Sequence, residues 1–457
     1  TTEIYTLSLH DALPISYWEA QFDDVQADLP RDRIVVGGIQ ADSASCRITF
    51  DAEITRRLLQ ECGNAYRTRT EDLLITALVR VLCQWGRQPS VLIELEGHGR
   101  EPFDDTETID LTRTAGWFTS LYPLCLRTEA EVGATIKSVK ERLRRVPQRG
   151  MGWGVLKYLG EESCRTALQA LPRPRVTFNY LGQFDASLTD NAIFRLAVEN
   201  RGNEQSVDAP LANWLEINSQ VYGGALQMTW TYSKSMYRSE TVEQLAHRYR
   251  DELNALIEHC TSGVSGVTPA DFPLANLEQA ALERLPVEAS VVEDIYPLSP
   301  MQQGMLFHSL DPAQAGLYVS QFDIAIDGLE PARFRAAWHE VVARHAILRT
   351  GFAWRDSDHP LQIVHRSAGL AITEQDLRDD VDPSVRLQAL ADDELARGFA
   401  LDTPPLMRIV LAQTAAGRYR MVWTCHHLLL DGWSSARLLN EVLQRYGGHP
   451  LNALPGS

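Results

Sequence analysis

The sequence has few cysteines and no arrangement of them that suggests a disulfide framework. The seven cysteines stand singly, without a C-x-x-C pair, and their number is odd, a pattern that suits a reducing cytosol. The chain also lacks any apolar run near the roughly 20 residues needed to cross a bilayer, and no signal peptide opens it. We therefore expect a cytoplasmic protein that does not enter a membrane.

The chain also has fewer basic than acidic residues. The chain has 43 lysines and arginines against 60 aspartates and glutamates, which gives a formal net charge of -17 at pH 7. Such an excess of negative charge opposes nonspecific binding to nucleic acids and to anionic membrane surfaces. Hydrophobic residues make up 44% of the 457 residues, an ordinary share for a globular protein, and this length allows two or three domains.

Helical and strand patterns alternate along most of the chain. Residues 73–85 carry an apolar stripe at helical spacing, and the strand pattern 91–95 leads into a polar turn at 96–101. A later helix opens with a capping box formed by Ser299 and Gln302. Mixed elements of this kind indicate a layered α/β sandwich.

Two segments interrupt this regular pattern. Residues 1–16 show no clear period and look like translated sequencing-adapter read-through, so we treat them as non-native. Residues 261–290 contain glycines and prolines but few periodic apolar residues, which is typical of a linker. The remaining chain divides into two parts, residues 17–260 and residues 291–457.

The most informative motif is a doubled histidine near the C-terminus. Residues 425–434 read CHHLLLDGWS, at the end of a predicted strand and before a predicted helix. Adjacent residues of a strand point to opposite faces, so only one of His426 and His427 can face a cavity while the other packs. The same geometry argues against a shared metal ion, and no metal site is predicted.

Several motifs, taken together, resemble those of nonribosomal peptide synthetases. The doubled-histidine segment resembles the HHxxxDG signature of their condensation domains, which is shared with the wider chloramphenicol-acetyltransferase-like acyltransferases. Four upstream motifs are similar, in order and spacing, to those of an epimerization domain: Leu95–Glu101, Arg113–Pro123, Pro147–Gly154 and Phe178–Asp185. Two downstream motifs look like the opening motifs of a condensation domain that takes a D-configured donor: Tyr296–His308 and Arg344–Phe352.

The resemblance implies two chloramphenicol-acetyltransferase-like α/β sandwich lobes joined by a linker. Residues 17–260 would be the C-terminal lobe of an epimerization domain, and residues 291–457 the truncated N-terminal lobe of a condensation domain. The opposing histidine of the epimerase belongs to an HHxxxD motif expected before Tyr17, and the sequence does not contain it. Both active sites are therefore expected to be incomplete, and the fragment is expected to be catalytically poor or inert.

The resemblance also assigns roles to individual residues. In the condensation part, His427 would face the reaction channel and accept a hydrogen bond or proton from the acceptor amine, with His426 in support. Asp431 would be structural and pair with Arg349, while Gly432 would allow a positive φ or a close backbone approach. In the epimerase part, Glu96 would be one acid/base group, and a solvated turn carboxylate is the alternative for it. The groups lining the epimerase channel would be Asn179 and Tyr180.

The activities implied are inversion of the α-carbon of a carrier-bound aminoacyl or peptidyl thioester and peptide-bond formation between carrier-bound substrates. The partners would be the peptidyl carrier and adenylation domains of the same synthetase. No cofactor is expected on this chain itself, because the substrates would be held on the phosphopantetheine arm of the carriers. Two alternatives remain at this point: a coenzyme-A-dependent acyltransferase, and a noncatalytic module that docks carrier proteins.

Overall fold

The computed structural model divides the chain into two compact units, Thr1–Ala270 and Asp271–Ser457. It describes residues 15–452 apart from residues 24, 26, 35–37, 101–109, 112, 184–201, 203–204, 312–315 and 356–358. Most of the segment that we treat as non-native therefore lies outside the described residues. Its last two residues begin helix α2 (Ile15–Glu19), and Ile15 packs against the core of the first unit.

The first unit is built on one six-stranded sheet with the strand order β1-β6-β5-β4-β2-β3. Strands β2, β4 and β5 run parallel to one another, and the other neighbours are antiparallel. The strands are β1 (Ser43–Thr49), β2 (Ser90–Gly97), β3 (Ser120–Arg127), β4 (Val176–Gln183), β5 (Leu215–Tyr222) and β6 (Ala225–Ser233). The helices after α2 are α3 (Ala52–Gln60), α4 (Gly63–Tyr66), α5 (Thr70–Gly86), α6 (Val132–Arg144), α7 (Met151–Leu159), α8 (Glu162–Ala170) and α9 (Ser239–Cys260).

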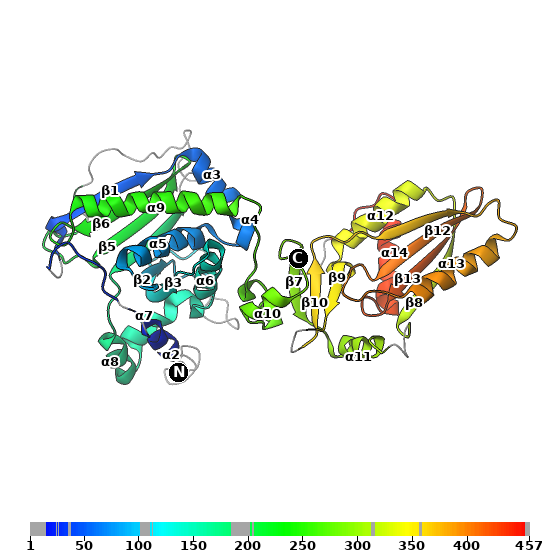
Figure 1. The fold of residues 1–457 in the computed structure, drawn as a ribbon, viewed down its shortest axis with the longest axis horizontal. Coiled ribbons are helices and arrows are strands. Elements are labelled where there is room, and N and C mark those ends of the chain that lie inside the picture. The colour runs from blue at the N-terminus through cyan, green and yellow to red at the C-terminus, as the bar shows by residue number, and fades with distance from the viewer. Residues whose placement is uncertain are drawn as a thin grey trace. The chain divides into compact units, whose positions relative to one another are not determined.

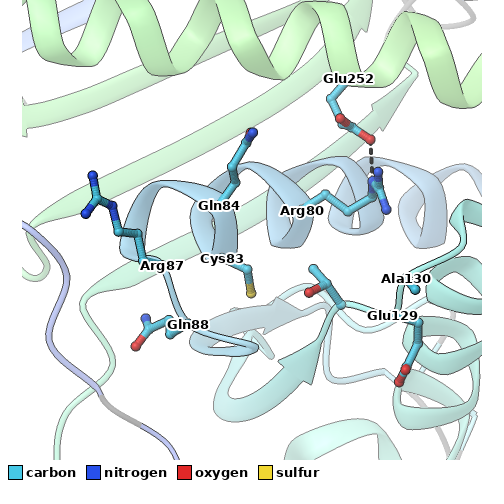
Figure 2. Close-up of a pocket in the computed structure, with 9 residues that line it drawn as sticks. Arg80, Cys83, Gln84, Arg87, Gln88, Glu129, Ala130 and Glu252 are labelled. Atoms are coloured by element: carbon cyan, nitrogen blue, oxygen red, sulfur yellow. Dashed lines mark hydrogen bonds and ion pairs between the residues drawn. The ribbon is translucent and has the colours of Figure 1, made fainter.

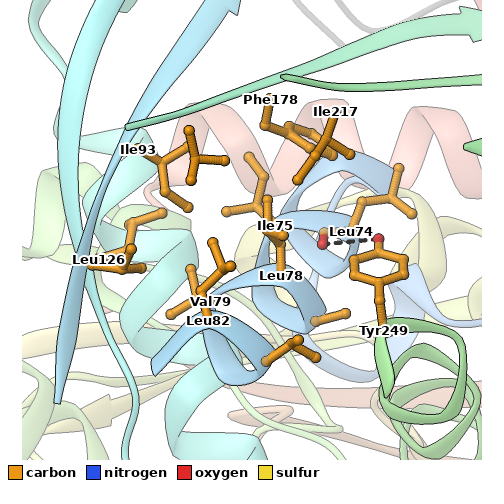
Figure 3. Close-up of a cluster of buried hydrophobic side chains, with 14 of the residues drawn as sticks. Leu74, Ile75, Leu78, Val79, Leu82, Ile93, Leu126, Phe178, Ile217 and Tyr249 are labelled. Carbon is orange, nitrogen blue, oxygen red and sulfur yellow. Dashed lines mark hydrogen bonds between the residues drawn. The ribbon is translucent and has the colours of Figure 1, made fainter. Parts of the chain in front are cut away.

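The core of this unit lies between one face of the sheet and helices α5 and α9 (Figure 1). Helix α5 is buried on nearly all sides because residues 73–79 are almost entirely apolar. Its leucines and isoleucine lie among buried side chains of the strands, which include Phe178 of β4 and Ile217 of β5 (Figure 3). The hydroxyl of Tyr249, on α9, donates to the carbonyl of Leu74 at 3.1 Å and ties the two helices together.

The opposite face of this sheet is polar. Side chains alternate between the two faces along each strand, so β5 buries Leu215 and Ile217 while Glu216 between them stays half-buried on the other side. Strand β2 extends to Gly97, two residues beyond the strand predicted from the sequence. Glu96 therefore lies on a strand of the sheet. The alternative interpretation of Glu96, a carboxylate in a solvated turn, does not fit this position.

The second unit contains a three-stranded sheet, β7-β10-β9, and a four-stranded sheet, β11-β12-β13-β8. Its strands are β7 (Val292–Pro297), β8 (Val319–Asp327), β9 (Thr350–Ala353), β10 (Leu361–His365), β11 (Ala371–Asp376), β12 (Met407–Ala415) and β13 (Arg418–His426). Its helices are α10 (Gln279–Arg284), α11 (Pro300–Ser309), α12 (Pro331–Arg344), α13 (Pro383–Arg397) and α14 (Gly432–Tyr446). Both units thus have the mixed α/β architecture expected of two chloramphenicol-acetyltransferase-like lobes.

Alternation along β13 gives the four-stranded sheet two packed faces. Met421 and Trp423 belong to the core beneath α12 and α14, whereas Val422 packs on the other face with Leu387 and Ala391 of α13. The predicted capping box is confirmed at the start of α11. The Ser299 hydroxyl accepts from the Gln302 N–H at 3.3 Å, and the Gln302 side chain accepts from the Ser299 N–H at 3.0 Å.

The segment predicted as a linker is more ordered than its composition suggests. The boundary between the two units falls inside it, between Ala270 and Asp271. Its first part packs on the first unit, where the Ala270 N–H donates to Glu141 Oε1 at 2.8 Å. Its second part contains α10, and Phe272 and Leu282 are buried. None of the described helices combines the length and the apolar content required to span a bilayer.

Candidate functional site

The doubled histidine lies at the end of β13, beside β8. His426 is 4% exposed and its ring meets the edge of Phe399, whereas His427 is only half-buried. The His427 N–H donates to the Tyr318 carbonyl at 2.8 Å, which extends the ladder between β13 and β8 by one residue. The structure therefore separates the two imidazoles, as the alternation of an extended strand requires.

The Nδ1 atom of one histidine faces a backbone donor, and the Nδ1 atom of the other faces a backbone acceptor. The Leu428 N–H donates to His426 Nδ1 at 3.1 Å, so neutral His426 carries its proton on Nε2. His427 Nδ1 lies 3.2 Å from the Leu430 carbonyl oxygen, which can only accept, so His427 carries its proton on Nδ1. Neighbouring imidazoles are thus held as opposite tautomers, and the lone pair of His427 is on Nε2.

His426 is poorly suited to carry a positive charge. Burial, with a smaller contribution from neighbouring His427, lowers the pKa of His426 to about 4. Protonation at Nδ1 would also break the hydrogen bond that the Leu428 N–H donates. His426 is therefore a neutral packing residue that fixes the backbone at the end of β13.

The predicted ion pair between Asp431 and Arg349 is wrong. Asp431 is the N-cap of α14, and its carboxylate accepts from the Ser434 N–H at 2.7 Å. This hydrogen bond to the Ser434 backbone is the main reason that the pKa of Asp431 is lowered. Asp431 holds the loop after the histidines by capping a helix.

Arg349 pairs with Glu293 instead. Its Nη1 atom lies 2.6 Å from Glu293 Oε2 and also donates to the His365 carbonyl. The Arg349 side chain is only 6% exposed, so this pair ties β7 to the short segment that precedes β9 and to the end of β10. The sequence could not reveal Glu293 as the partner, because the choice depends on the path of β7.

Gly432 shows neither of the features predicted for it. It is the first residue of α14 and does not have a positive φ. A Cβ atom placed on it would have no neighbour within 4 Å, so no close backbone approach demands glycine here. The chain turns at Asp431, and the helix has already begun at Gly432.

A cavity of about 250 Å³ lies beside the loop that follows the histidines. Most of its lining is apolar, and it also includes Glu441, whose carboxylate oxygen lies 2.7 Å from His345 Nε2. Trp433 lines it and is 76% exposed. The residues that line the cavity are His345, Ile347, Leu348, Leu429, Leu430, Trp433, Ser434, Arg437, Leu438 and Glu441.

In the first unit, the structure brings Glu96 and Asn179 together on the polar face of the sheet. The two residues lie on the parallel neighbours β2 and β4, and Asn179 Nδ2 donates to Glu96 Oε2 at 2.8 Å. Burial raises the pKa of Glu96, and the negative charges of Glu216 and Glu94 raise it further. Glu96 is therefore a carboxyl group that holds its proton more strongly than an exposed glutamate does.

Sequence reasoning missed the carboxylates that surround Glu96. Glu94 Oε2 accepts from Thr177 Oγ1 at 3.1 Å and from Asn213 Nδ2 at 2.9 Å. Glu216, on β5, accepts from Asn218 Nδ2 at 2.8 Å. The signal was present as polar residues at alternate positions on three strands, but it becomes readable only when the strand order is known.

Tyr180 is not part of this cluster. It follows Asn179 on β4, so its side chain points to the opposite face, where it packs against the core of the first unit. Burial raises the pKa of Tyr180, and the nearby carboxylate of Glu71 raises it further. The two predicted channel residues, Asn179 and Tyr180, thus lie on different faces of one strand.

A second cavity, of about 430 Å³, lies at the C-terminal end of α5 and contains none of the predicted site residues (Figure 2). Arg80 and Glu252 form an ion pair on its wall. Burial raises the pKa of Cys83 to about 12, so this thiol stays protonated and is not a nucleophile. Across the described residues of both units, no group of three or more His, Cys, Asp or Glu side chains could hold a metal ion.

Comparison with protein families adds an independent observation. The model of the family described as the condensation domain matches residues 14–271 and 292–457. These ranges coincide closely with the two compact units. The residues between the two ranges lie within or next to the predicted linker, and the first range already includes Ile15.

Known proteins similar to this chain include peptide synthases from two bacteria. A component of the linear gramicidin synthase of Brevibacillus parabrevis is 39% identical over 439 residues, which cover 94% of this chain and 6% of that protein. Bacitracin synthase 1 of Bacillus licheniformis is 32% identical over 441 residues, which cover 94% of this chain and 8% of that protein. The chain thus spans less than a tenth of the length of these relatives.

Among solved structures, the epimerization domain from the third module of tyrocidine synthetase B is similar to this chain. The two are 33% identical with a TM-score of 0.51, and the match covers 55% of this chain and 56% of that domain. The match therefore covers a little more than half of that domain.

Proposed function

The chain belongs to the condensation domain family of the nonribosomal peptide synthetases, and we propose that it joins parts of two different members of this family. The first unit is the C-terminal lobe of an epimerization domain, and the second is the N-terminal lobe of the condensation domain that follows it. The observation that carries this proposal is the family match in two separate ranges, one on each unit, of which only the second contains a doubled histidine.

The first unit contributes a proton-transfer group to the inversion of an α-carbon held as a thioester. Inversion removes the α-proton from one face and returns a proton to the other, so acid/base groups must flank the carbon. Glu96 is the group on this unit, with a pKa raised toward the working pH. Its partner Asn179 holds the carboxylate in place and offers an amide to the developing enolate oxygen.

The second unit contributes His427 to peptide-bond formation. An α-amino group has a pKa of about 7.7 to 8.0, so a large share of the acceptor amine is already neutral near pH 7 to 8. A positioned base is typically worth about 10²- to 10⁴-fold, whereas holding two tethered reactants together can supply roughly 7 to 11 kcal/mol. Positioning therefore comes first, and His427 Nε2 accepts a hydrogen bond or the proton of the attacking amine.

The substrates reach both units on the phosphopantetheine arms of carrier domains, and adenylation domains of the same synthetase supply the activated amino acids. The chain binds no cofactor of its own. Each unit supplies one wall of a channel whose other wall belongs to a second lobe. The isolated chain is therefore catalytically inert, although the synthetase that contains it is an enzyme.

The isolated chain can be tested with an aminoacyl thioester carried on a phosphopantetheinylated carrier domain in deuterium oxide. We expect NMR shifts of Glu96 or His427 on addition of the loaded carrier, no such shifts with the acyl-coenzyme A thioester, and neither α-deuterium incorporation nor peptide product. Turnover of the coenzyme A thioester would favour a free-standing acyltransferase. Robust turnover of the carrier-bound substrate would show that the sites are complete.

A further inference from the structure

In the structure, His427 Nε2, the nitrogen proposed to accept from the amine, already has a hydrogen-bond partner within the chain. Ser320 Oγ, on β8, lies 2.7 Å from His427 Nε2. His427 Nδ1 carries the ring proton, because it faces the Leu430 carbonyl, so Nε2 must accept and the Ser320 hydroxyl must donate. Ser320 belongs to none of the motifs that identified the two units.

The sheet register explains why Ser320 reaches this nitrogen. In the antiparallel pair of β8 and β13, Ser320 lies opposite Cys425 and Tyr318 lies opposite His427. Ser320 and His427 are therefore diagonal neighbours on one face of the sheet, at a separation that side chains can bridge. The bond runs from a residue of β8 to the residue directly after the last one of β13, and the His427 N–H is itself held by the Tyr318 carbonyl, which gives the imidazole a rigid support.

We propose that Ser320 is a positioning residue for His427, holding the imidazole with Nε2 as its accepting nitrogen and presenting that nitrogen to the acceptor amine. This inference rests on the proposed role of His427 in condensation. The Leu430 carbonyl and the Ser320 hydroxyl clamp the ring from both sides. These two hydrogen bonds fix both the ring plane and the tautomer. In functional histidines, the hydrogen bond made by one ring nitrogen commonly sets the protonation of the other.

The incoming amine meets Nε2 through or in place of this hydroxyl. As the amine nitrogen forms its bond to the thioester carbonyl carbon, the carbon–sulfur bond breaks and the sulfur leaves as a thiolate. The proton lost by the amine passes to His427 Nε2, directly or with the Ser320 hydroxyl accepting one proton as it donates its own. The thiolate finally takes that proton, so the histidine returns to its starting state.

The neighbouring histidine provides a matched contrast. His426 Nε2 also lies near a serine, Ser309, at 3.3 Å, but there the imidazole is the donor because its Nδ1 accepts the Leu428 N–H. The Ser309 hydroxyl in turn donates to the Met305 carbonyl at 2.7 Å. Ser309 therefore accepts from a buried histidine, whereas Ser320 donates to a half-buried one.

The test is nitrogen-15 NMR of the histidine rings in the intact chain at pH 8. In the unmodified chain, His427 should be the Nδ1–H tautomer and His426 the Nε2–H tautomer. Ser320→Ala should move the bare Nε2 resonance of His427 downfield, because it loses a hydrogen bond, and should leave His426 unchanged. Ser320→Thr keeps the hydroxyl and should restore the original spectrum. Ser309→Ala should affect only His426.

Two results would overturn the proposal. One is an Nε2–H tautomer at His427 in the unmodified chain, which needs no variant to observe. The other is a His427 spectrum that Ser320→Ala leaves unchanged in a folded chain. In a synthetase with a complete condensation domain, Ser320→Ala should lower kcat roughly tenfold with KM unchanged, a part of what a positioned base supplies. If His427→Ala has no effect there, the proposed function fails while the tautomer result stands.

Discussion

The side-chain amide of Asn179 donates to a carboxylate oxygen of Glu96 at 2.8 Å, which joins two motifs that lie 83 residues apart in the chain. Because β2 and β4 are parallel neighbours, the contact is set by the sheet and not by a flexible loop. The carboxylates of Glu94 and Glu216 lie on the same face. This arrangement raises the pKa of Glu96, and the shift can be measured.

Replacing Glu216 with glutamine should lower the pKa of Glu96. Burial is the main cause of the raised pKa of Glu96, and Glu216 is the larger of the two charge contributions. Removing one negative charge makes ionisation of Glu96 easier, so its titration should move to lower pH. Carbon-13 NMR of the glutamate carboxyl groups measures this directly. A Glu96 titration that stays in place would show that the charge of Glu216 does not act on Glu96.

Gly150 should be irreplaceable, whereas Gly154 should not. Both belong to the motif Pro147–Gly154, but Gly150 has φ of 90° and a Cβ atom there would collide with the ring of Tyr122. Gly150→Ala should cost about 2 kcal/mol or more of unfolding free energy in the first unit. Urea unfolding followed by tryptophan fluorescence measures the loss.

Gly154→Ala is the control for this substitution. Gly154 lies within α7, and its added Cβ would meet nothing within 4 Å. Alanine should therefore be neutral or stabilise the first unit by about 0.5 to 1 kcal/mol, because it lowers the backbone entropy of the unfolded chain. Equal destabilisation by both substitutions would contradict the account of Gly150.

A double-mutant cycle should couple Arg349 to Glu293. Glu293→Ala removes the carboxylate partner of a buried guanidinium and should lower the unfolding free energy of the second unit by about 1 to 3 kcal/mol. Combined with Arg349→Met, the two effects should be strongly non-additive. Asp431→Ala should also destabilise this unit, through the lost helix cap, but should add independently to Arg349→Met. Coupling between Arg349 and Asp431 would contradict this account and support the ion pair predicted from the sequence.

The second unit should lose stability as the pH falls from about 6.5 to about 4. His426 has a pKa lowered to about 4 in the folded state from its ordinary 6.5. In this window the unfolded chain binds a proton that the folded chain does not, so stability is full above the window and declines through it. The loss should reach about 3 kcal/mol.

Unfolding in urea at several pH values, followed by tryptophan fluorescence, measures this slope. His426→Asn supplies the control, since its side-chain oxygen can accept the Leu428 N–H as Nδ1 does and it does not titrate. The asparagine variant should show a shallower dependence on pH in this window. An unchanged slope would mean that another group is responsible.

Apolar periodicity predicted most elements well because it reflects burial, which decides where helices and strands form. The helix pattern 73–85 became α5, and the strand pattern before the histidines became β13. Alternation along a strand also correctly separated His426 from His427. The same rule, applied to Asn179 and Tyr180, would have placed them on opposite faces of β4.

What the sequence could not supply was the partner of each polar side chain. Arg349 lies beside Glu293 because β7 and β9, which begins directly after Arg349, both pair with β10 in one sheet, and no local pattern encodes that pairing. Ser320 is one serine among many until the register of β8 against β13 places it diagonal to His427. The carboxylates around Glu96 likewise become a cluster only through the order of three strands.

The account as a whole is tested most directly in a synthetase that contains this chain together with complete epimerization and condensation domains. The measurement is deuterium incorporation at the donor α-carbon and peptide-bond formation, followed in the same reaction by mass spectrometry. Glu96→Gln should abolish incorporation, and a D-configured donor should restore the peptide product. His427→Ala should leave incorporation intact and abolish the peptide. Three results would contradict the assignment of the two units to two successive reactions: loss of deuterium incorporation in His427→Ala, failure of a D-configured donor to restore the peptide in Glu96→Gln, or loss of neither activity in either variant.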